Sequence, residues 1–313
     1  MPQGQCRLCG VESDLQLSHI LPAFAIRWLK ESSGSGHIRR SDAPNLRVQD
    51  GEKRRWLCIA CEGLLGQSET IFAGELFHPY TNGKASQFDY GPWLLRFCVS
   101  VSWRVLLFQR DETAVMKDYA PDTVARCNEA ESIWRAFLLG QQPNPGPFQQ
   151  HLLPLNEIAE ISGQPDNLSS YINRYFMRTI DMDLCHGRNT NYVYSKLGRF
   201  VILGFVREDR PNHWIGTKVH VRKGRIEPRS YSVPSGLFGY MNTRARSVAE
   251  GHSGISPRQA AKIDQSFREN RDNYIDSDHF IALQNDVRMF GNAAFTRKRS
   301  SEVDGAEESK KSS

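Results

Sequence analysis

The stretches Cys6-Arg7-Leu8-Cys9 and Cys58-Ile59-Ala60-Cys61 lie on either side of the run His19-Ile20-Leu21-Pro22. Two thiolates with two residues between them can bind one metal ion, and two such pairs complete a tetrahedral four-cysteine zinc site. A thioredoxin-like redox motif would instead have one pair at the start of a helix in a βαβ unit, and neither pair has that context. The spacing therefore predicts a structural Zn²⁺ ion bound by Cys6, Cys9, Cys58 and Cys61.

The residues around these pairs predict the local structure. Gly10 supplies a turn after the first pair, and the alternation of Leu15 and Leu17 with polar residues predicts a short strand that ends at His19. Pro22 opens an amphipathic helix from Ala23 to Lys30. A further helix runs from Cys61 through Leu76, and we expect it to end at His78-Pro79, because a residue before proline is disfavoured in a helix.

This order of cysteines, strand, histidine and helix resembles the zinc-bearing branch of the HNH nucleases, over about the first 75 residues. The resemblance implies a ββα treble-clef finger with a catalytic histidine at the end of its first strand. It also implies that the histidine activates a water while a divalent ion, Mg²⁺ or Mn²⁺, stabilises the phosphate. By position, His19 would be the general base, and Glu62, directly after the last cysteine, would be the metal ligand.

The chain departs from the family pattern at several positions. Where the family has Asp or His before the catalytic histidine, this chain has Ser18, and where it has Asn before the third cysteine, this chain has Lys53. Asn45 is the nearest candidate for the missing asparagine. Glu62 replaces a family histidine, and a carboxylate is a good ligand for a hard cation. Glu69 lies two helical turns further on the same face and is a candidate second ligand.

Basic residues precede the second cysteine pair and are candidate contacts for nucleic-acid phosphates: Arg47, Lys53, Arg54 and Arg55. The alternative is an ordinary solvated surface cluster. The net charge of +5 allows a nucleic-acid partner without requiring one. With the resemblance, DNA is favoured over RNA, and a protein partner or a homo-oligomer is also allowed.

Composition points to a cytoplasmic protein without a membrane segment. The first five residues are polar and contain no apolar signal core. The longest apolar run, Trp93 to Phe108, contains Arg96 and Arg104 and is too short to span a bilayer. The remaining cysteines are odd in number and scattered, which suits buried thiols in a reducing compartment: Cys98, Cys127 and Cys185.

After the first 85 residues, the patterns predict helices, then strands, then helices. Helices are expected over 93–110, 123–139 and 168–180. Four short segments rich in β-branched and aromatic residues predict an antiparallel sheet: 192–194, 200–206, 214–221 and 225–233, the last two joined by a tight turn at Lys223-Gly224. A capping box at Ser256 predicts a helix to about Tyr274, and Ser277 caps another to about Phe290.

We therefore expect an α+β protein with an N-terminal zinc finger, a helical middle, a small antiparallel sheet and C-terminal helices. The predicted units are residues 1–85, residues 86–291 and a disordered tail, 292–313. The leading hypothesis is a metal-dependent HNH-like endonuclease with His19, Glu62 and Asn45 in its site; such nucleases are often associated with phage defence. The alternative is a zinc-stabilised module that binds nucleic acid or protein without cleaving it.

Overall fold

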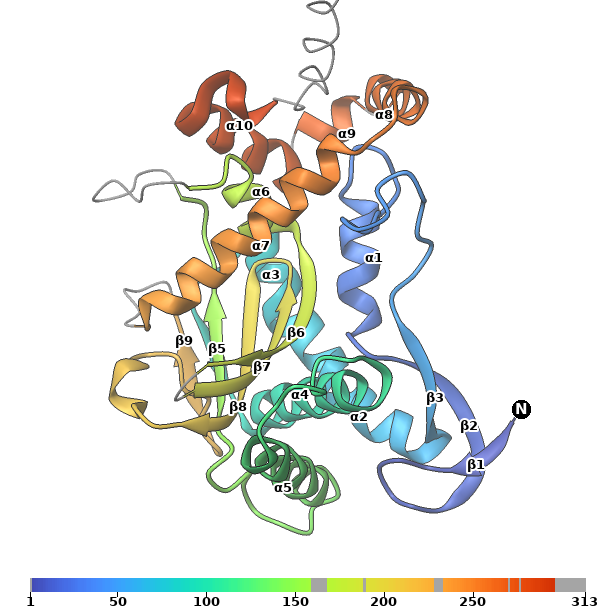
Figure 1. The fold of residues 1–313 in the computed structure, drawn as a ribbon, viewed down its shortest axis with the longest axis vertical. Coiled ribbons are helices and arrows are strands. Elements are labelled where there is room, and N and C mark those ends of the chain that lie inside the picture. The colour runs from blue at the N-terminus through green and yellow to red at the C-terminus, as the bar shows by residue number, and fades with distance from the viewer. Residues whose placement is uncertain are drawn as a thin grey trace, which may run out of the picture.

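A four-stranded antiparallel sheet is the central layer of the fold (Figure 1). Its strand order is β5-β8-β7-β6, with bounds Gln150–Pro154, Phe200–Glu208, Thr190–Leu197 and Ile180–His186. The computed structural model describes residues 2–158, 168–187, 190–227, 233–269, 271–275 and 277–295. Mixed helices and small antiparallel sheets make up this part of the chain, as the α+β prediction requires.

Both faces of this sheet are covered, because its strands carry apolar side chains on both sides. Val193 and Ile202 pack into a core with helix α4 (Pro92–Glu112) and helix α5 (Pro121–Leu138). Their neighbours along the strands, Tyr194 and Leu203, pack into a second core on the opposite face, as expected from the two-residue period of a strand. Helix α4 lies at the centre of this core, since it contacts all four strands.

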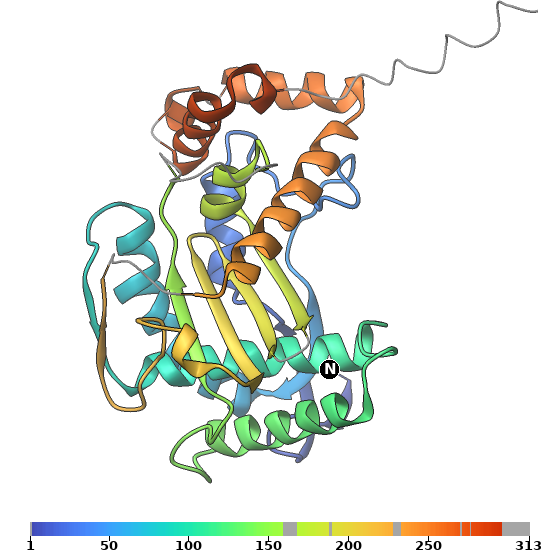
Figure 2. The ribbon, with the colours of Figure 1, turned by 60° about the vertical axis from the view of Figure 1, so that its left-hand side comes forward.

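The second face is covered by helices from the C-terminal part of the chain (Figure 2). Helix α6 (Ile172–Arg178) and helix α7 (Ser235–Ser253) pack together there, and α10 (Asp278–Phe290) packs on α6. The short helices α8 (Pro257–Glu269) and α9 (Arg271–Ile275) connect α7 to α10. None of the described helices is long and apolar enough to cross a membrane.

The N-terminal part forms a three-stranded antiparallel sheet with two helices. Its elements are β1 (Gln3–Gln5), β2 (Glu12–His19), α1 (Ala23–Glu31), β3 (Lys53–Cys58) and α2 (Ile59–Ile71). As predicted, β2 ends at His19 and a helix begins at Ala23. A separate two-stranded sheet pairs β4 (Phe88–Tyr90) with β9 (Gly224–Ile226).

The helix after the second cysteine pair runs further than predicted. A π-helical turn, Phe72–Phe77, follows α2, and α3 (His78–Thr81) continues beyond Pro79. The prediction that His78-Pro79 ends the helix is therefore wrong. Pro79 lies in the first turn of α3, where a missing backbone N–H costs little.

One hydrophobic core extends across residue 85. Phe72 of the π-helical turn stacks on Phe97 of α4, with ring centroids 3.9 Å apart, and it also contacts Phe24 of α1 and Phe200 of β8. All four rings are buried. The division of the chain at residue 85 stays a prediction, and residues on both sides of that position share this core.

Of the four predicted strands, 192–194 and 200–206 are confirmed within β7 and β8, 214–221 is wrong, and residues 225–226 of the fourth lie in strand β9. Segment 214–221 is irregular: it meets β5 through the hydrogen bonds Leu152 N–H to Thr217 O (2.8 Å) and Val219 N–H to Gln150 O (2.9 Å). Gly224 does not form the predicted hairpin turn but begins β9, whose partner is β4. Residues 228–232 of the fourth predicted strand lie outside the described residues.

The predicted helices over 93–110, 123–139 and 277–290 are confirmed as α4, α5 and α10. The predicted helix over 168–180 is only α6, because Ile180 already begins β6. Ser256 caps the next helix as predicted, because the Gln259 N–H donates to Ser256 Oγ at 3.3 Å. The second bond of a capping box is not formed, since the Ser256 N–H donates to Asn45 Oδ1 instead. In the predicted tail, 292–294 instead form part of a 3₁₀ turn with Ala294 buried, and residues from 296 on lie outside the described residues.

Close packing of α4 and α5 on the sheet requires glycine at position 204 of β8. A Cβ atom there would lie 2.5 Å from Ser102 Oγ and 2.9 Å from Trp134 Cη2. We expect Gly204→Ala to lower the free energy of unfolding by about 1–3 kcal/mol through overpacking, measured by urea denaturation.

Gly239→Ala is the matched control. Gly239 lies on the exposed side of α7 with open space where a Cβ would be, so alanine there should be neutral or stabilise by up to about 1 kcal/mol. If Gly204→Ala and Gly239→Ala change the free energy of unfolding equally, α4 and α5 do not pack closely against Gly204.

Candidate functional site

The four predicted zinc ligands, Cys6, Cys9, Cys58 and Cys61, come together in one cluster. Their four Sγ atoms all lie within 4.8 Å of one another, and Cys9 Sγ lies 3.8 Å from Cys58 Sγ. A tetrahedral zinc with Zn–S bonds of about 2.3 Å places its sulfurs about 3.8 Å apart. The four-cysteine cluster could therefore hold a metal ion such as zinc.

The two cysteine pairs come from two different turns. The first pair lies in the turn between β1 and β2, which Gly10 closes with a φ of 81° and an N–H that donates to Cys6 O at 2.8 Å. In the second pair, Cys58 ends β3 and Cys61 lies in the first turn of α2. The Cys58 N–H donates to Cys6 Sγ at 3.4 Å. This backbone hydrogen bond helps to hold the Cys6 sulfur in the cluster.

The acidities of the thiols in this cluster differ. Burial alone raises the pKa of Cys6, but hydrogen bonds from the backbone of Cys9, Cys58 and Leu8 outweigh it and lower the pKa to about 7. Burial and the neighbouring thiols raise the pKa of Cys61 well above its ordinary value. Four thiolates this close together repel one another, and a bound cation removes that repulsion.

The predicted general base, His19, faces a carboxylate that the sequence had not suggested. His19 Nε2 lies 2.8 Å from Asp50 Oδ1, and the imidazole is 20% exposed. Asp50 Oδ2 also lies 2.5 Å from Lys53 Nζ. Burial alone would raise the pKa of Asp50, but hydrogen bonds from Lys53, His19 and the Gly51 N–H lower it below its ordinary value. Asp50 is therefore an ionised acceptor for the imidazole.

The predicted metal ligand, Glu62, lies beside the residue that precedes His19. Ser18 Oγ donates to Glu62 Oε2 at 2.5 Å, and Ser18 is 2% exposed. Glu62 is only partly buried, in the first turn of α2. The two positions where the resembled family binds its catalytic ion are therefore joined by a hydrogen bond in this chain.

Glu69, the candidate second ligand, is paired with a buried arginine instead. Arg104 Nη2 of α4 lies 2.5 Å from Glu69 Oε1, and Arg104 Nη1 donates to the backbone O of His19 at 2.9 Å. Arg104 is 4% exposed. A buried guanidinium needs such a charged partner, so this carboxylate neutralises Arg104 and helps to hold the end of β2.

Asn45 is bound to a different part of the molecule. Its side-chain nitrogen donates to Gly254 O at 2.9 Å, and its side-chain oxygen accepts from the Ser256 N–H at 2.8 Å. The structure thus brings Asp50, rather than Asn45, to His19. A catalytic role for Asn45 stays a prediction without a contact to support it.

The four predicted phosphate-contacting residues differ in how far nearby acids neutralise them. Lys53 pairs with Asp50, and Arg54 lies within ion-pair distance of Glu52 and Glu112, at 3.3 and 3.5 Å. The Arg55 guanidinium donates to Leu15 O, whereas Arg47 is exposed and has no ion pair with a described residue. Arg47 and Arg55 are therefore the better candidates for phosphate contacts.

Two residues of the site were missed at the sequence level. Asp50 precedes Gly51 in an Asp-Gly pair, which marks a turn, and only the fold brings this turn to the end of β2. Arg104 could have been found, because a charged residue within a long apolar helix needs a buried partner.

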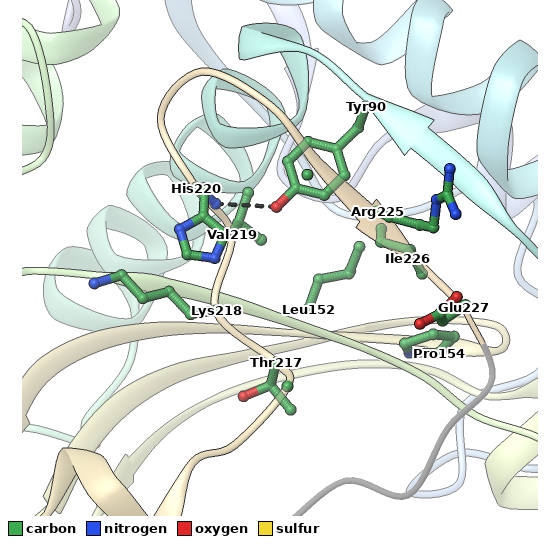
Figure 3. A pocket seen from close by; sticks show the side chains of 12 residues that line it. Tyr90, Leu152, Pro154, Thr217, Lys218, Val219, His220, Arg225, Ile226 and Glu227 are labelled. Atoms are coloured by element: carbon green, nitrogen blue, oxygen red, sulfur yellow. Dashed lines mark hydrogen bonds between the residues drawn. The ribbon is translucent and has the colours of Figure 1, made fainter.

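A separate cavity of about 370 Å³ lies between β4, β5, β9 and segment 216–220 (Figure 3). Tyr90 points into it, and its hydroxyl accepts from the His220 N–H at 3.1 Å. Lys218 and Arg225 also line the cavity. Its lining includes none of the residues predicted for the catalytic site.

Among the described residues, the four-cysteine cluster is the one group of three or more potential metal ligands within mutual reach. No protein-family model, curated protein or solved structure matches this chain.

We expect the purified protein to contain one zinc per chain, measured by elemental analysis. Cys58→Ser should lose this zinc and lower the thermal midpoint, because metal binding contributes folding free energy. Cys185→Ser is the control, since Cys185 lies on β6 outside the cluster, and it should keep its zinc. Wild-type protein without zinc would exclude the site.

We expect Arg104→Met to destabilise the protein by about 3 kcal/mol, because Glu69 is left without its buried partner. Glu69→Gln in the same chain should restore part of that loss, which a double-mutant cycle in urea measures as coupling of at least about 1 kcal/mol.

Arg268→Met is the control for Arg104→Met. Arg268 and Asp264 form an exposed pair at 2.7 Å, and such pairs contribute less than about 1 kcal/mol. If the effects of Arg104→Met and Glu69→Gln on the free energy of unfolding are additive, Glu69 does not stabilise the protein through Arg104.

Proposed function

We propose that the chain is a metal-dependent endonuclease of the HNH-like type, which hydrolyses phosphodiester bonds in nucleic acid. One observation carries the proposal. At the end of β2, two consecutive side chains each meet a carboxylate: Ser18 meets Glu62 and His19 meets Asp50. A histidine oriented by one carboxylate, with a second carboxylate on the adjoining helix, is a suitable arrangement for attack by water on a phosphate.

His19 would take the proton from the attacking water. Because Asp50 is ionised and accepts a hydrogen bond, Nε2 of His19 carries the hydrogen, and Nδ1 is left to accept a proton. Nδ1 makes no hydrogen bond to a described residue. As His19 gains the proton, the negative charge of Asp50 stabilises the imidazolium.

Glu62 would hold the divalent cation. Mg²⁺ is commonly bound through one or two protein carboxylates together with substrate phosphates and water, so a single carboxylate with a hydroxyl beside it fits that ion. When bound, the ion would supply positive charge to the phosphate in the transition state. Ser18 orients the carboxylate through its 2.5 Å hydrogen bond.

The four-cysteine cluster would supply rigidity rather than chemistry. Cys58 and Cys61 begin α2, and Glu62 is the next residue. A zinc ion bound there would fix the first turn of this helix relative to the β1–β2 turn. Since a catalytic group must be held within a fraction of an ångström, zinc would keep Glu62 beside Ser18 and His19.

A second candidate function is a zinc-stabilised module that binds nucleic acid without cleaving it. The observation that favours it is the Ser18–Glu62 hydrogen bond, which uses the two positions where the resembled family has metal ligands. Under this alternative, Asp50 and Glu62 are structural partners of His19 and Ser18.

A plasmid-nicking assay with Mg²⁺ or Mn²⁺ separates the two functions. We expect the wild type to nick DNA, and His19→Ala and Glu62→Gln each to lower the rate by at least about 100-fold, with zinc content unchanged. Glu62→Gln keeps an acceptor for Ser18 and removes the charge that binds a cation.

His213→Ala is the control, because His213 is exposed and lies outside the N-terminal sheet; its nicking rate should equal that of the wild type. If the wild type cleaves neither DNA nor RNA with either metal, or if His19→Ala cleaves equally well, the enzyme proposal fails and the binding module remains.

A further inference from the structure

Four basic side chains gather where the end of α1 meets the segment that follows it. Lys30 lies in the last turn of α1, and His37, Arg39 and Arg47 belong to segment 37–48, which an antiparallel bridge between Ile38 and Val48 closes. We call these four residues the cationic cluster. Within the described part of the chain, no carboxylate lies within ion-pair distance of any of them.

The charges of this cluster act on one another. Burial and the positive charges of Arg47, Arg39 and Lys30 lower the pKa of His37. Burial and the charge of Arg47 lower the pKa of Arg39. Opposite charge nearby would have the reverse effect, so this surface carries positive charge that the described residues do not compensate.

Arg39 also has a buried hydrogen-bond donor without an acceptor. Its Nη1 atom is enclosed and has no partner among the described residues. Leaving a buried charged donor unpaired is destabilising. Because Nη1 is enclosed, an anion accepts from it only when the half-buried Arg39 side chain shifts toward solvent. The neighbouring residue differs: Arg40 pairs with Asp42 at 2.6 Å and with Glu52 at 3.3 Å.

The segment that carries the cluster is fixed to the C-terminal helices. Asn45 makes two hydrogen bonds to the turn between α7 and α8. Gly251 of α7 lies directly against the backbone of Ser41, and Gly34 packs against Phe267 and Tyr274. The cationic cluster is therefore preorganised, which reduces the entropy cost of binding a ligand.

We propose that the cationic cluster is a phosphate-binding subsite that holds one backbone phosphodiester of a nucleic-acid strand, with Arg39 and Arg47 as its main contacts. Guanidinium groups match the geometry of phosphate oxygens and bind them with charge-assisted hydrogen bonds. This proposal rests on the proposed function, because it assumes that the strand bound at the cluster is the one that reaches His19.

The position of the cluster fits such a strand. His19 precedes α1 and Lys30 lies in its last turn, so the two sites are at opposite ends of this helix. A helix of nine residues is about 13 Å long. That length equals the rise along the axis of B-DNA over roughly four phosphates of one strand, at about 3.4 Å each. The subsite would thus hold the strand a few nucleotides from the bond that is cleaved.

The test is a fluorescence-anisotropy titration of a labelled 24-base-pair DNA duplex, and of its single strand, at several salt concentrations. We expect Arg39→Gln and Arg47→Gln each to weaken binding several-fold and to reduce the slope of log K against log salt by about 0.7–0.9, as one lost phosphate contact predicts. Arg40→Gln is the matched control and should change neither, because Arg40 is already paired with carboxylates. His213→Ala, an exposed position outside the N-terminal sheet, should bind as the wild type does.

Each result decides the matter. If the wild-type protein binds neither the duplex nor the single strand, the subsite is excluded. It is also excluded if Arg39→Gln and Arg47→Gln bind with the wild-type salt slope. If only inorganic phosphate raises the thermal midpoint, and does so in an Arg39-dependent way, the cluster takes the free anion and the phosphodiester assignment is overturned. If binding depends on Arg39 but the wild type does not nick DNA, the subsite is supported and the nuclease proposal fails. If the wild type nicks DNA but Arg39→Gln and Arg47→Gln keep the wild-type salt slope, the nuclease proposal is supported and the subsite is excluded.

Discussion

The buried guanidinium of Arg104 joins the two parts of the molecule on which the candidate site depends. It extends from the middle of α4, donates to the backbone O of His19 at 2.9 Å and pairs with Glu69 of α2 at 2.5 Å. A buried charge is stable only when it is paired and hydrogen-bonded. The end of β2 and the face of α2 must therefore keep their places on α4, and the N-terminal sheet cannot move freely relative to the central sheet.

The four-cysteine cluster imposes a second constraint at the other end of the same elements. It joins the β1–β2 turn to the start of α2, while Arg104 holds the end of β2 and a later turn of α2. Between these two attachments, Ser18 and His19 lie on opposite faces of β2, as successive strand residues do. Each face then has its own carboxylate, Glu62 on one and Asp50 on the other. A phosphate that contacts both His19 and an ion at Glu62 must therefore lie across the end of β2, where His19 is the last strand residue.

Local patterns predicted much of this structure because they depend on short-range physics. The cysteine spacing, the strand that ends at His19 and the apolar helix α4 could all be read from neighbouring residues. Long-range pairings could not. Strands β5 and β6 contain few of the residues typical of strands, and β9 pairs with β4 across more than a hundred residues. Asp50 and Arg104 acquire their roles from partners that only the tertiary fold supplies.

Anomalous scattering from crystals soaked in Mn²⁺ can show whether one metal ion holds the N-terminal sheet and a second binds at Glu62. Maps at the zinc and manganese absorption edges identify each ion and its ligands. We expect a zinc peak among the sulfurs of Cys6, Cys9, Cys58 and Cys61, and a manganese peak at the carboxylate of Glu62. Cysteines without zinc would exclude the structural site, and a Glu62 that stays bonded to Ser18 with no manganese beside it would exclude the catalytic one.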